Sequence, residues 1–153
     1  MMHLIYKKPS VFKWGLSWWA PYLGTGISVR DIASDYSSLT VQMKQRWYNR
    51  NAFGTHFGGS LYAMCDPFFA LLLVAKLGKG YVVWDKAASI EFVKPGTGTV
   101  SAHFHWSQAQ IDEIIAQAAQ GRSIFPVRSL EVLNAQGQVV ARVEKTLYVK
   151  KRA

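Results

Sequence analysis

The chain has 153 residues, of which half are hydrophobic and 14% are aromatic, and 18 Lys and Arg against nine Asp and Glu leave a formal charge of +9. This length and composition exclude a disordered chain and favour a single domain over residues 1–153. The only cysteine, Cys65, excludes an internal disulfide, so we expect a reducing, cytoplasmic location.

The N-terminal segment, residues 1–23, predicts a short aromatic-rich helix rather than a secretion signal, because lysines and a proline interrupt its apolar residues. Trp14 and Trp18 lie one helical turn apart, which is the spacing of a helix that packs on its own domain. The same aromatic residues, with the basic charge, leave open a peripheral contact with a membrane surface. The longest apolar run, Phe68 to Ala75, is shorter than the about 20 residues that cross a bilayer.

The rest of the chain alternates between strand-like and helix-like patterns. Apolar and polar residues alternate at about 27–29 and 39–47, which predicts half-buried strands. Residues 56–77 predict a central helix that is apolar on nearly every side and must therefore be surrounded by protein. Further strands are expected at about 81–84, 88–93 and 100–106. After a short helix that begins with a Ser107–Gln110 capping box and ends by Gly121, strands at 125–133 and 139–150 form a hairpin.

These patterns predict the fold class. Strands that alternate are buried on one face, as in antiparallel sheets, whereas one helix is apolar all round. The economical arrangement is an α+β fold in which a curved antiparallel sheet wraps around a long central helix. The far side of that helix then needs a cover, which a second copy of the chain would supply.

The candidate catalytic groups lie at the start of the central helix and further along it. Gly58 and Gly59 allow a ligand to approach the backbone, and the first amide groups of a helix point at such a ligand unpaired, which suits a carbonyl oxygen or an oxyanion. Asp66 lies about 10 Å further along the helix, too far to act on the same carbonyl. Two antiparallel copies would bring the amides of one subunit to Asp66 of the other.

Asp66 is followed by Pro67, which removes a helical N–H and frees the carbonyl of Ala63. The resulting local kink would point the carboxylate outwards. Alternatively, the Asp66-Pro67 pair only marks a helix break that local hydrogen bonds satisfy.

The spacing of Asn51, Gly58-Gly59 and Asp66 resembles that of the hot-dog-fold acyl-CoA thioesterases, particularly the phenylacetyl-CoA thioesterase type. The stretch from Phe57 to Pro67 is also similar to a poorly characterised branch of thioesterases. The resemblance implies a hot-dog fold with a short N-terminal helix. It also implies hydrolysis of an acyl-CoA or acyl carrier protein thioester at composite sites of a homodimer or a dimer of dimers, without a metal or organic cofactor.

The resemblance also implies roles for single residues. Asp66 would be the nucleophile or general base, Asn51 would orient the carbonyl or water, and Gly59 would present a polarising amide. The remaining residues expected to contact the substrate are Gly58, His56, Phe57, Ser60 and Met64. Phe57 stands where the relatives usually have a histidine, and the neighbouring His56 cannot be assumed to replace it.

Other interpretations of the sequence stay open. A non-catalytic protein of the same fold would bind a fatty acyl chain in an aromatic pocket without hydrolysing it. His103 and His105 project to one side of a strand, but no third ligand accompanies them, so no metal site is predicted. Cys65 is expected to be a packing residue, because burial and the adjacent Asp66 oppose its thiolate.

The excess of basic residues favours anionic partners such as phosphates, lipid headgroups or acidic metabolites. Nucleic acid is not predicted, because the sequence has no RNP-like motif, zinc-ligand spacing or recognition-helix pattern. Coenzyme A carries several phosphates, so basic side chains at a pocket mouth suit an acyl-CoA substrate equally well.

Overall fold

The structure of the chain is a computed structural model that describes residues 8–152. The first seven residues of the predicted N-terminal segment therefore lie outside the described residues. The elements follow in the order α2 (Pro9–Ser17), α3 (Ala20–Leu23), β1 (Ile27–Ile32), β2 (Ser38–Lys44), α4 (Gly58–Ala63), α5 (Phe68–Leu77), the 3-10 turn η1 (Gly78–Gly80), β3 (Tyr81–Phe92), β4 (Thr99–His105), α6 (Gln108–Ala118), β5 (Val127–Asn134) and β6 (Val139–Lys151).

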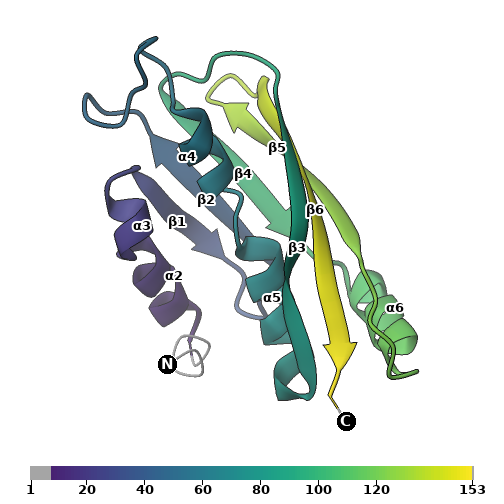
Figure 1. Ribbon diagram of the computed structural model, residues 1–153. Helices are drawn as coiled ribbons and strands as arrows, with labels where there is room; N and C mark the ends of the chain where they lie inside the picture. Colours follow the sequence, from purple (N-terminus) through teal and green to yellow (C-terminus); the bar gives the residue numbers. More distant parts are fainter. Residues whose placement is uncertain (1–7, 153) are drawn as a thin grey trace.

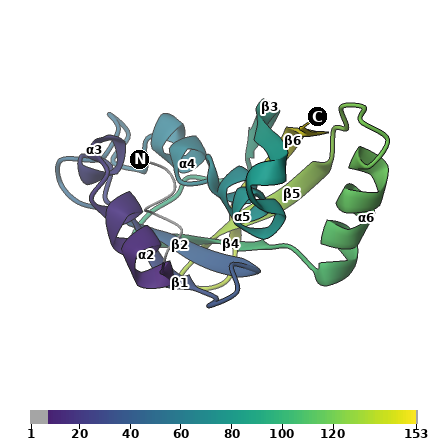
Figure 2. The ribbon, with the colours of Figure 1, turned by 90° about the horizontal axis from the view of Figure 1, so that it is seen from below.

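The strands form one six-stranded sheet in the order β1-β2-β4-β5-β6-β3, and every neighbouring pair is antiparallel. The sheet curves around α4 and α5, which lie in its concave face, while α2 and α3 lie beside β1 and α6 lies at the opposite end of the molecule (Figures 1 and 2). β3 is one edge of the sheet. The predicted α+β arrangement, a curved antiparallel sheet around a central helix, is confirmed.

The core lies between the concave face of the sheet and α5. Alternate residues of β2 and β4 are buried, as the period of two requires, and they face the aromatic side of α5. The ring of Phe69 lies 5.0 Å from that of Phe104 and 5.8 Å from that of Trp106. The Trp106 indole also donates a hydrogen bond to the Phe69 carbonyl at 3.1 Å, so a buried polar group is satisfied.

The predicted central helix is divided into two helices at the Asp66-Pro67 pair, where the sequence predicts a kink or a break. α4 ends at Ala63 and α5 begins at Phe68, with the Asp66-Pro67 pair between them. The stretch Gly58–Gly80 is long and apolar enough to cross a membrane, but here it is broken at this point and supplies the centre of the core. The break places a carboxylate in the middle of the apolar stretch.

Two strands also differ from their predicted bounds. β3 is one strand of 12 residues with a register shift between Asp85 and Ala87, where two shorter strands were predicted. β2 ends at Lys44, so Trp47, predicted at the end of that strand, lies exposed in the following loop. The capping box of α6 is confirmed, because the Ser107 hydroxyl accepts from the Gln110 amide at 3.3 Å and the Ser107 amide donates to the Gln110 side chain at 3.0 Å.

The predicted packing of the N-terminal helix on its own domain is confirmed, although Trp14 and Trp18 do not make the contact. α2 does pack on β1, but it does so through Phe12 and Leu16, which are buried. Trp14 and Trp18 lie on the other side of the helix and are 63% and 67% exposed. Both pairs have helical spacing, and contact with the sheet decides which pair faces inward.

Candidate active site

The break between α4 and α5 is held by a tyrosine from the N-terminal segment. The Tyr22 hydroxyl donates to the carbonyl of Ala63 at 3.2 Å and to the carbonyl of Asp66. Pro67 has no N–H to offer the Ala63 carbonyl, so Tyr22 replaces the missing helical partner. Burial, and then the charge of Asp66, raise the pKa of Tyr22, which therefore stays a hydrogen-bond donor at neutral pH.

The carboxylate of Asp66 is held by two side chains of the same protomer. Lys145 Nζ lies 2.6 Å from Asp66 Oδ1, and the Tyr62 hydroxyl lies 3.4 Å from the same oxygen. Lys145 also donates to the Tyr62 hydroxyl at 3.2 Å. The side chain of Asp66 is 43% exposed. One carboxylate oxygen is thus fixed on a side chain that solvent reaches.

Lys145 is fully buried and has a second carboxylate partner. Asp85 Oδ2, on β3, lies 3.3 Å from Lys145 Nζ. Burial by itself would lower the pKa of Lys145, but the hydrogen bond that Lys145 donates to Asp66 and the charges of both carboxylates outweigh it, so that this pKa is raised. Lys145 therefore stays charged beside Asp66.

Asp85 is the second carboxylate partner of Lys145, and its surroundings raise its pKa. Burial is the largest effect and raises the pKa of the Asp85 carboxyl, against the attraction of Lys145, and the nearby charge of Asp66 raises it further. Its Oδ1 is buried without a hydrogen-bond partner among the described residues. Lys145 thus forms ion pairs with two carboxylates, of which Asp66 is the more exposed.

At the start of α4, two glycines let aromatic rings lie against the backbone. A Cβ at Gly58 would come within 3.0 Å of the Phe92 ring, and one at Gly59 within 2.5 Å of the Phe57 ring. The first helical hydrogen bonds begin at Ser60 and Leu61, which both donate to the Phe57 carbonyl. Across the described part of the chain, the amides of Gly58 and Gly59 donate no hydrogen bond, as expected for a first turn.

The side chain of Asn51 is occupied within its own loop. Its Oδ1 accepts from the amides of Phe53 and Thr55, and its Nδ2 donates to the Thr55 hydroxyl and the His56 carbonyl. All four contacts lie within five residues of Asn51, which makes it the organiser of the loop that leads to α4. In this structure its amide is not directed at Asp66.

A cavity of about 530 Å³ lies beside the start of α4. His56 lines it and is buried, and its Nε2 lies 2.9 Å from the Gly98 carbonyl. A carbonyl only accepts, so Nε2 carries the proton and Nδ1, which has no partner among the described residues, is an acceptor. Burial lowers the pKa of His56, which keeps it neutral. The other lining residues are Asn51, Phe53, Thr55, Gly58, Leu61, Phe92, Val93, Lys94, Pro95 and Gly96.

The remaining predicted site residues lie between these two places. Ser60 is buried on α4, and Met64 is fully buried in the core. Cys65 is also fully buried, and burial raises the pKa of its thiol to about 12, so it is a packing residue. The structure thus gathers Asn51, His56 and Gly58 at the cavity and sets Asp66 apart from them beyond α4.

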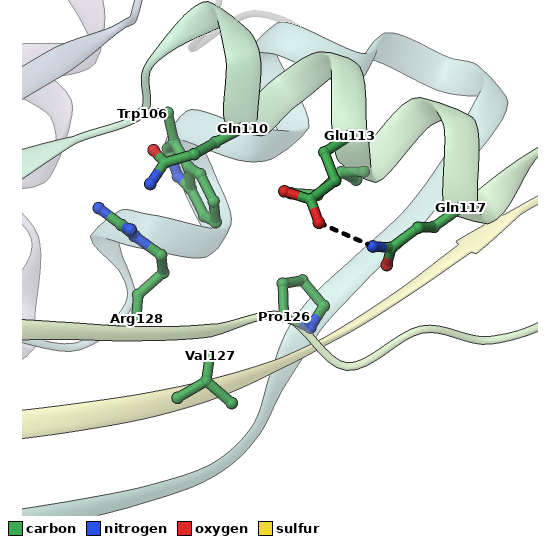
Figure 3. A pocket seen from close by; sticks show the side chains of 8 residues that line it. Trp106, Gln110, Glu113, Gln117, Pro126, Val127 and Arg128 are labelled. Carbon is green, nitrogen blue, oxygen red and sulfur yellow. Dashed lines mark hydrogen bonds between the residues drawn. The ribbon is translucent and has the colours of Figure 1, made fainter.

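A smaller cavity of about 230 Å³ lies between α6 and β5, and it contains none of the predicted site residues (Figure 3). Arg128 lies over the Trp106 ring at 5.1 Å, and Glu113 accepts a hydrogen bond from Gln117 at 3.0 Å.

No group of three or more metal-ligating side chains occurs in residues 8–152. His103 contacts Thr40 at 3.0 Å and is exposed.

Sequence reasoning missed Lys145, Asp85, Tyr62 and Tyr22. Lys145 carries a recognisable signal, because it occupies an inward position of β6 between the buried Val143 and Leu147. A lysine at such a position needs a carboxylate partner. The alternation does not say which carboxylate, since Lys145 and Asp66 are 79 residues apart.

The sequence profile of the family described as "Domain of unknown function (DUF4442)" matches residues 8–149. A search of curated proteins returned no similar sequence.

Three solved structures show what this chain is similar to in fold. A Pseudomonas aeruginosa protein of unknown function, described as a probable thioesterase, has a TM-score of 0.77 at 16% identity, over 87% of this chain and 88% of that one. A Chlorobaculum tepidum protein of unknown function has a TM-score of 0.74 at 15% identity, over 95% and 98%. A Haemophilus influenzae thioesterase has a TM-score of 0.67 at 15% identity, over 93% and 90%. These likenesses establish the hot-dog fold.

Proposed function

The chain belongs to the DUF4442 family, and from its fold and its charged cluster we propose that it hydrolyses an acyl thioester, of coenzyme A or acyl carrier protein, to a free acid and a thiol. Two proteins of similar fold are described as thioesterases. The proposed reaction adds water to the thioester carbonyl, breaks the C–S bond and returns one proton to the departing sulfur. We place it in the cytoplasm, as the single cysteine favours.

The arrangement of Asp66 is the observation that carries this proposal. Lys145 and Tyr62 hold Oδ1 of a side chain that is 43% exposed. A carboxylate in this position can take a proton from water or attack the carbonyl carbon directly. The ammonium group of Lys145 lies beside this carboxylate as a buried counter-charge.

The start of α4 supplies the complementary part of the site. The first-turn amides at Gly58 and Gly59 would stabilise the negative charge that develops on the carbonyl oxygen. The adjacent cavity has the volume of a small-molecule site and apolar walls that include Phe53, Leu61 and Phe92. We assign the acyl group to this cavity, where Phe57, Ser60 and His56 lie nearby.

The two parts come from different subunits in this proposal. Asp66 and Gly59 lie at opposite ends of α4, so a single protomer does not place both at one carbonyl carbon. Asp66 lies close to β3, through Lys145 and Asp85, and β3 is a sheet edge of 12 residues. A second copy that pairs along this edge would set its own α4 opposite Asp66.

The test is a thiol-release assay of the full chain with a panel of acyl-CoA thioesters. We expect turnover by the wild type and a loss of about 100-fold or more in kcat for Asp66→Asn, which keeps the size of the side chain but removes its charge. Asp112→Asn, at an exposed carboxylate of α6, is the matched control and keeps full activity. No turnover by the wild type, or full turnover by Asp66→Asn, would refute the proposal.

A second function is favoured by Phe57, whose ring lies over Gly59 where a histidine would be expected. A non-catalytic acyl binder would use the same cavity to sequester a fatty chain. It would show a rise in Tm with acyl-CoA but release no thiol.

A further inference from the structure

The outer face of α2 presents an apolar stripe to solvent. Val11, Trp14 and Trp18 are spaced three and four residues apart and are all exposed. The inner face of the helix is already occupied, since Phe12 and Leu16 pack against the domain. α2 is thus apolar on two sides, and only one of them is used within the described chain.

The stripe continues into the next helix and ends beside an exposed loop. Trp19, the N-cap of α3, and Leu23, its last residue, are also exposed. In the loop after β2, Trp47 is 83% exposed and its ring makes an edge contact with Tyr48 at 5.5 Å. Figures 1 and 2 both place this loop and α3 at the same end of the molecule.

Asn49 joins the two aromatic segments. Its Nδ2 donates to the carbonyls of Thr25 at 2.8 Å and Lys44 at 2.9 Å, which ties the loop to the turn after α3. Gly26 is needed in that turn, because a Cβ there would lie 2.8 Å from both Asn49 Nδ2 and the Lys44 carbonyl oxygen, and its φ is +74°. The two segments therefore keep a defined relation to each other.

The surroundings of this aromatic surface are basic. Residues 8–57 contain two acidic side chains, Asp31 and Asp35, and Asp35 is paired with Lys76 at 3.1 Å. The same range contains six basic residues: Lys8, Lys13, Arg30, Lys44, Arg46 and Arg50. Arg46 and Arg50 flank Trp47 and Tyr48 and are exposed.

This combination selects one class of partner. Trp and Tyr have an apolar ring and a polar N–H or O–H, so they are favoured where hydrocarbon meets water. A second copy docked through the same face would bring like charges together, whereas anionic lipid headgroups would neutralise them. Charge complementarity thus favours a lipid surface over another copy of this chain.

We propose that the outer face of α2 and α3, with the Trp47–Tyr48 loop, binds the surface of an anionic phospholipid bilayer. The contact is peripheral: the indole rings enter the headgroup region, and the arginines and lysines meet lipid phosphates. This function is separate from the thioester chemistry and does not depend on it.

The test is co-sedimentation of the full chain with phosphatidylcholine vesicles that contain about 30% phosphatidylglycerol. We expect binding that weakens in pure phosphatidylcholine and at high salt. The variant Trp14→Ser with Trp18→Ser should lose about tenfold or more in apparent affinity. The matched control is Ile115→Ser with Phe125→Ser, which removes two exposed apolar side chains at the other end of the molecule and should bind as the wild type.

A charge variant tests the proposal independently of the tryptophans. Arg46→Gln with Arg50→Gln should also weaken binding by about tenfold, with the Tm of the wild type. Light scattering of the tryptophan variant should give the wild-type mass. No binding of the wild type to anionic vesicles, or binding by the tryptophan and arginine variants that equals that of the wild type, would overturn the proposal. A smaller mass of the tryptophan variant would also overturn it, because the stripe would then join copies of the chain.

Discussion

At the scale of single residues, the decisive feature is a lysine buried between two carboxylates. Removing a charged ammonium group from water costs several kcal/mol, and only close opposite charges compensate for it. Asp66 at 2.6 Å and Asp85 at 3.3 Å supply them, with the Tyr62 hydroxyl as a third contact. The contacts that compensate for the burial of Lys145 therefore also orient the carboxylate of Asp66, the proposed catalytic group.

The substitution Lys145→Met tests this balance. It keeps the length of the side chain but leaves Asp66 and Asp85 facing each other without a cation. We expect the free energy of unfolding in urea at pH 7 to fall by about 3–5 kcal/mol. Lys150→Met, at an exposed position of the same strand, is the control and should change stability by less than about 0.5 kcal/mol. Equal effects of the two substitutions would contradict the account.

The same pair predicts a pH dependence. The pKa of Lys145 is raised from its ordinary value of 10.5 in the folded protein, so its contribution to stability is complete below that pH. The contribution is lost as the pH rises through the raised, folded-state pKa. The gap in unfolding free energy between wild type and Lys145→Met should therefore be constant from pH 7 to 10 and narrow above about 10.5. A gap that widens at high pH would show that Lys145 is not stabilised as a cation.

At the scale of elements, the central helix is defined by its interruption. Pro67 cannot continue the hydrogen-bond ladder, and α3 supplies Tyr22 to the carbonyls that are left. The N-terminal segment therefore does more than cover the sheet, because it holds the backbone that carries Asp66. The break also turns the Asp66 side chain towards Lys145 on β6.

The substitution Tyr22→Phe removes this contact while keeping the ring. A buried carbonyl that loses its donor costs about 1–3 kcal/mol, which urea unfolding should detect. If the protein is a thioesterase, kcat should fall with little change in KM, because Asp66 shifts while the acyl cavity, at the other end of α4, is untouched. Tyr48→Phe, on an exposed loop residue, is the control. A variant as stable as the wild type would mean that Tyr22 does not hold the break.

At the scale of the whole molecule, the two sheet edges differ. α2 packs beside β1 at one edge, whereas β3 at the other pairs only with β6 among the described strands. Long open edges are normally covered or paired. A dimer along β3 would satisfy this edge and complete the proposed site.

Mixed dimers test the shared site. Asp66→Asn and Gly59→Val protomers are each expected to be inactive as pure dimers, the second because a side chain there collides with the Phe57 ring. Mixing them after unfolding and refolding should restore about a quarter of wild-type activity, because half of the dimers are mixed and each has one intact site. Sites that lie within one protomer would restore none.

Local signals in the sequence were enough for much of this structure. Alternation predicted the strands, the Ser107–Gln110 box predicted the start of α6, and Pro67 predicted a freed Ala63 carbonyl. Each of these depends on residues within a few positions of one another, where the chain geometry is known in advance. The candidate residues Asp66, Gly58 and Gly59 were found in the same way.

Contacts between distant segments were decided by the tertiary structure alone. A lysine on an inward strand position shows that a carboxylate must be near, but only the register of β6 against the central helix selects Asp66 and Asp85. Likewise, the sequence makes α2 helical with two apolar stripes, and only its docking on β1 determines that the tryptophans face outward. The physical reason is that packing free energy depends on which surfaces come into contact. The spacing of apolar residues shows which face of a helix or strand is apolar, but not which element covers that face.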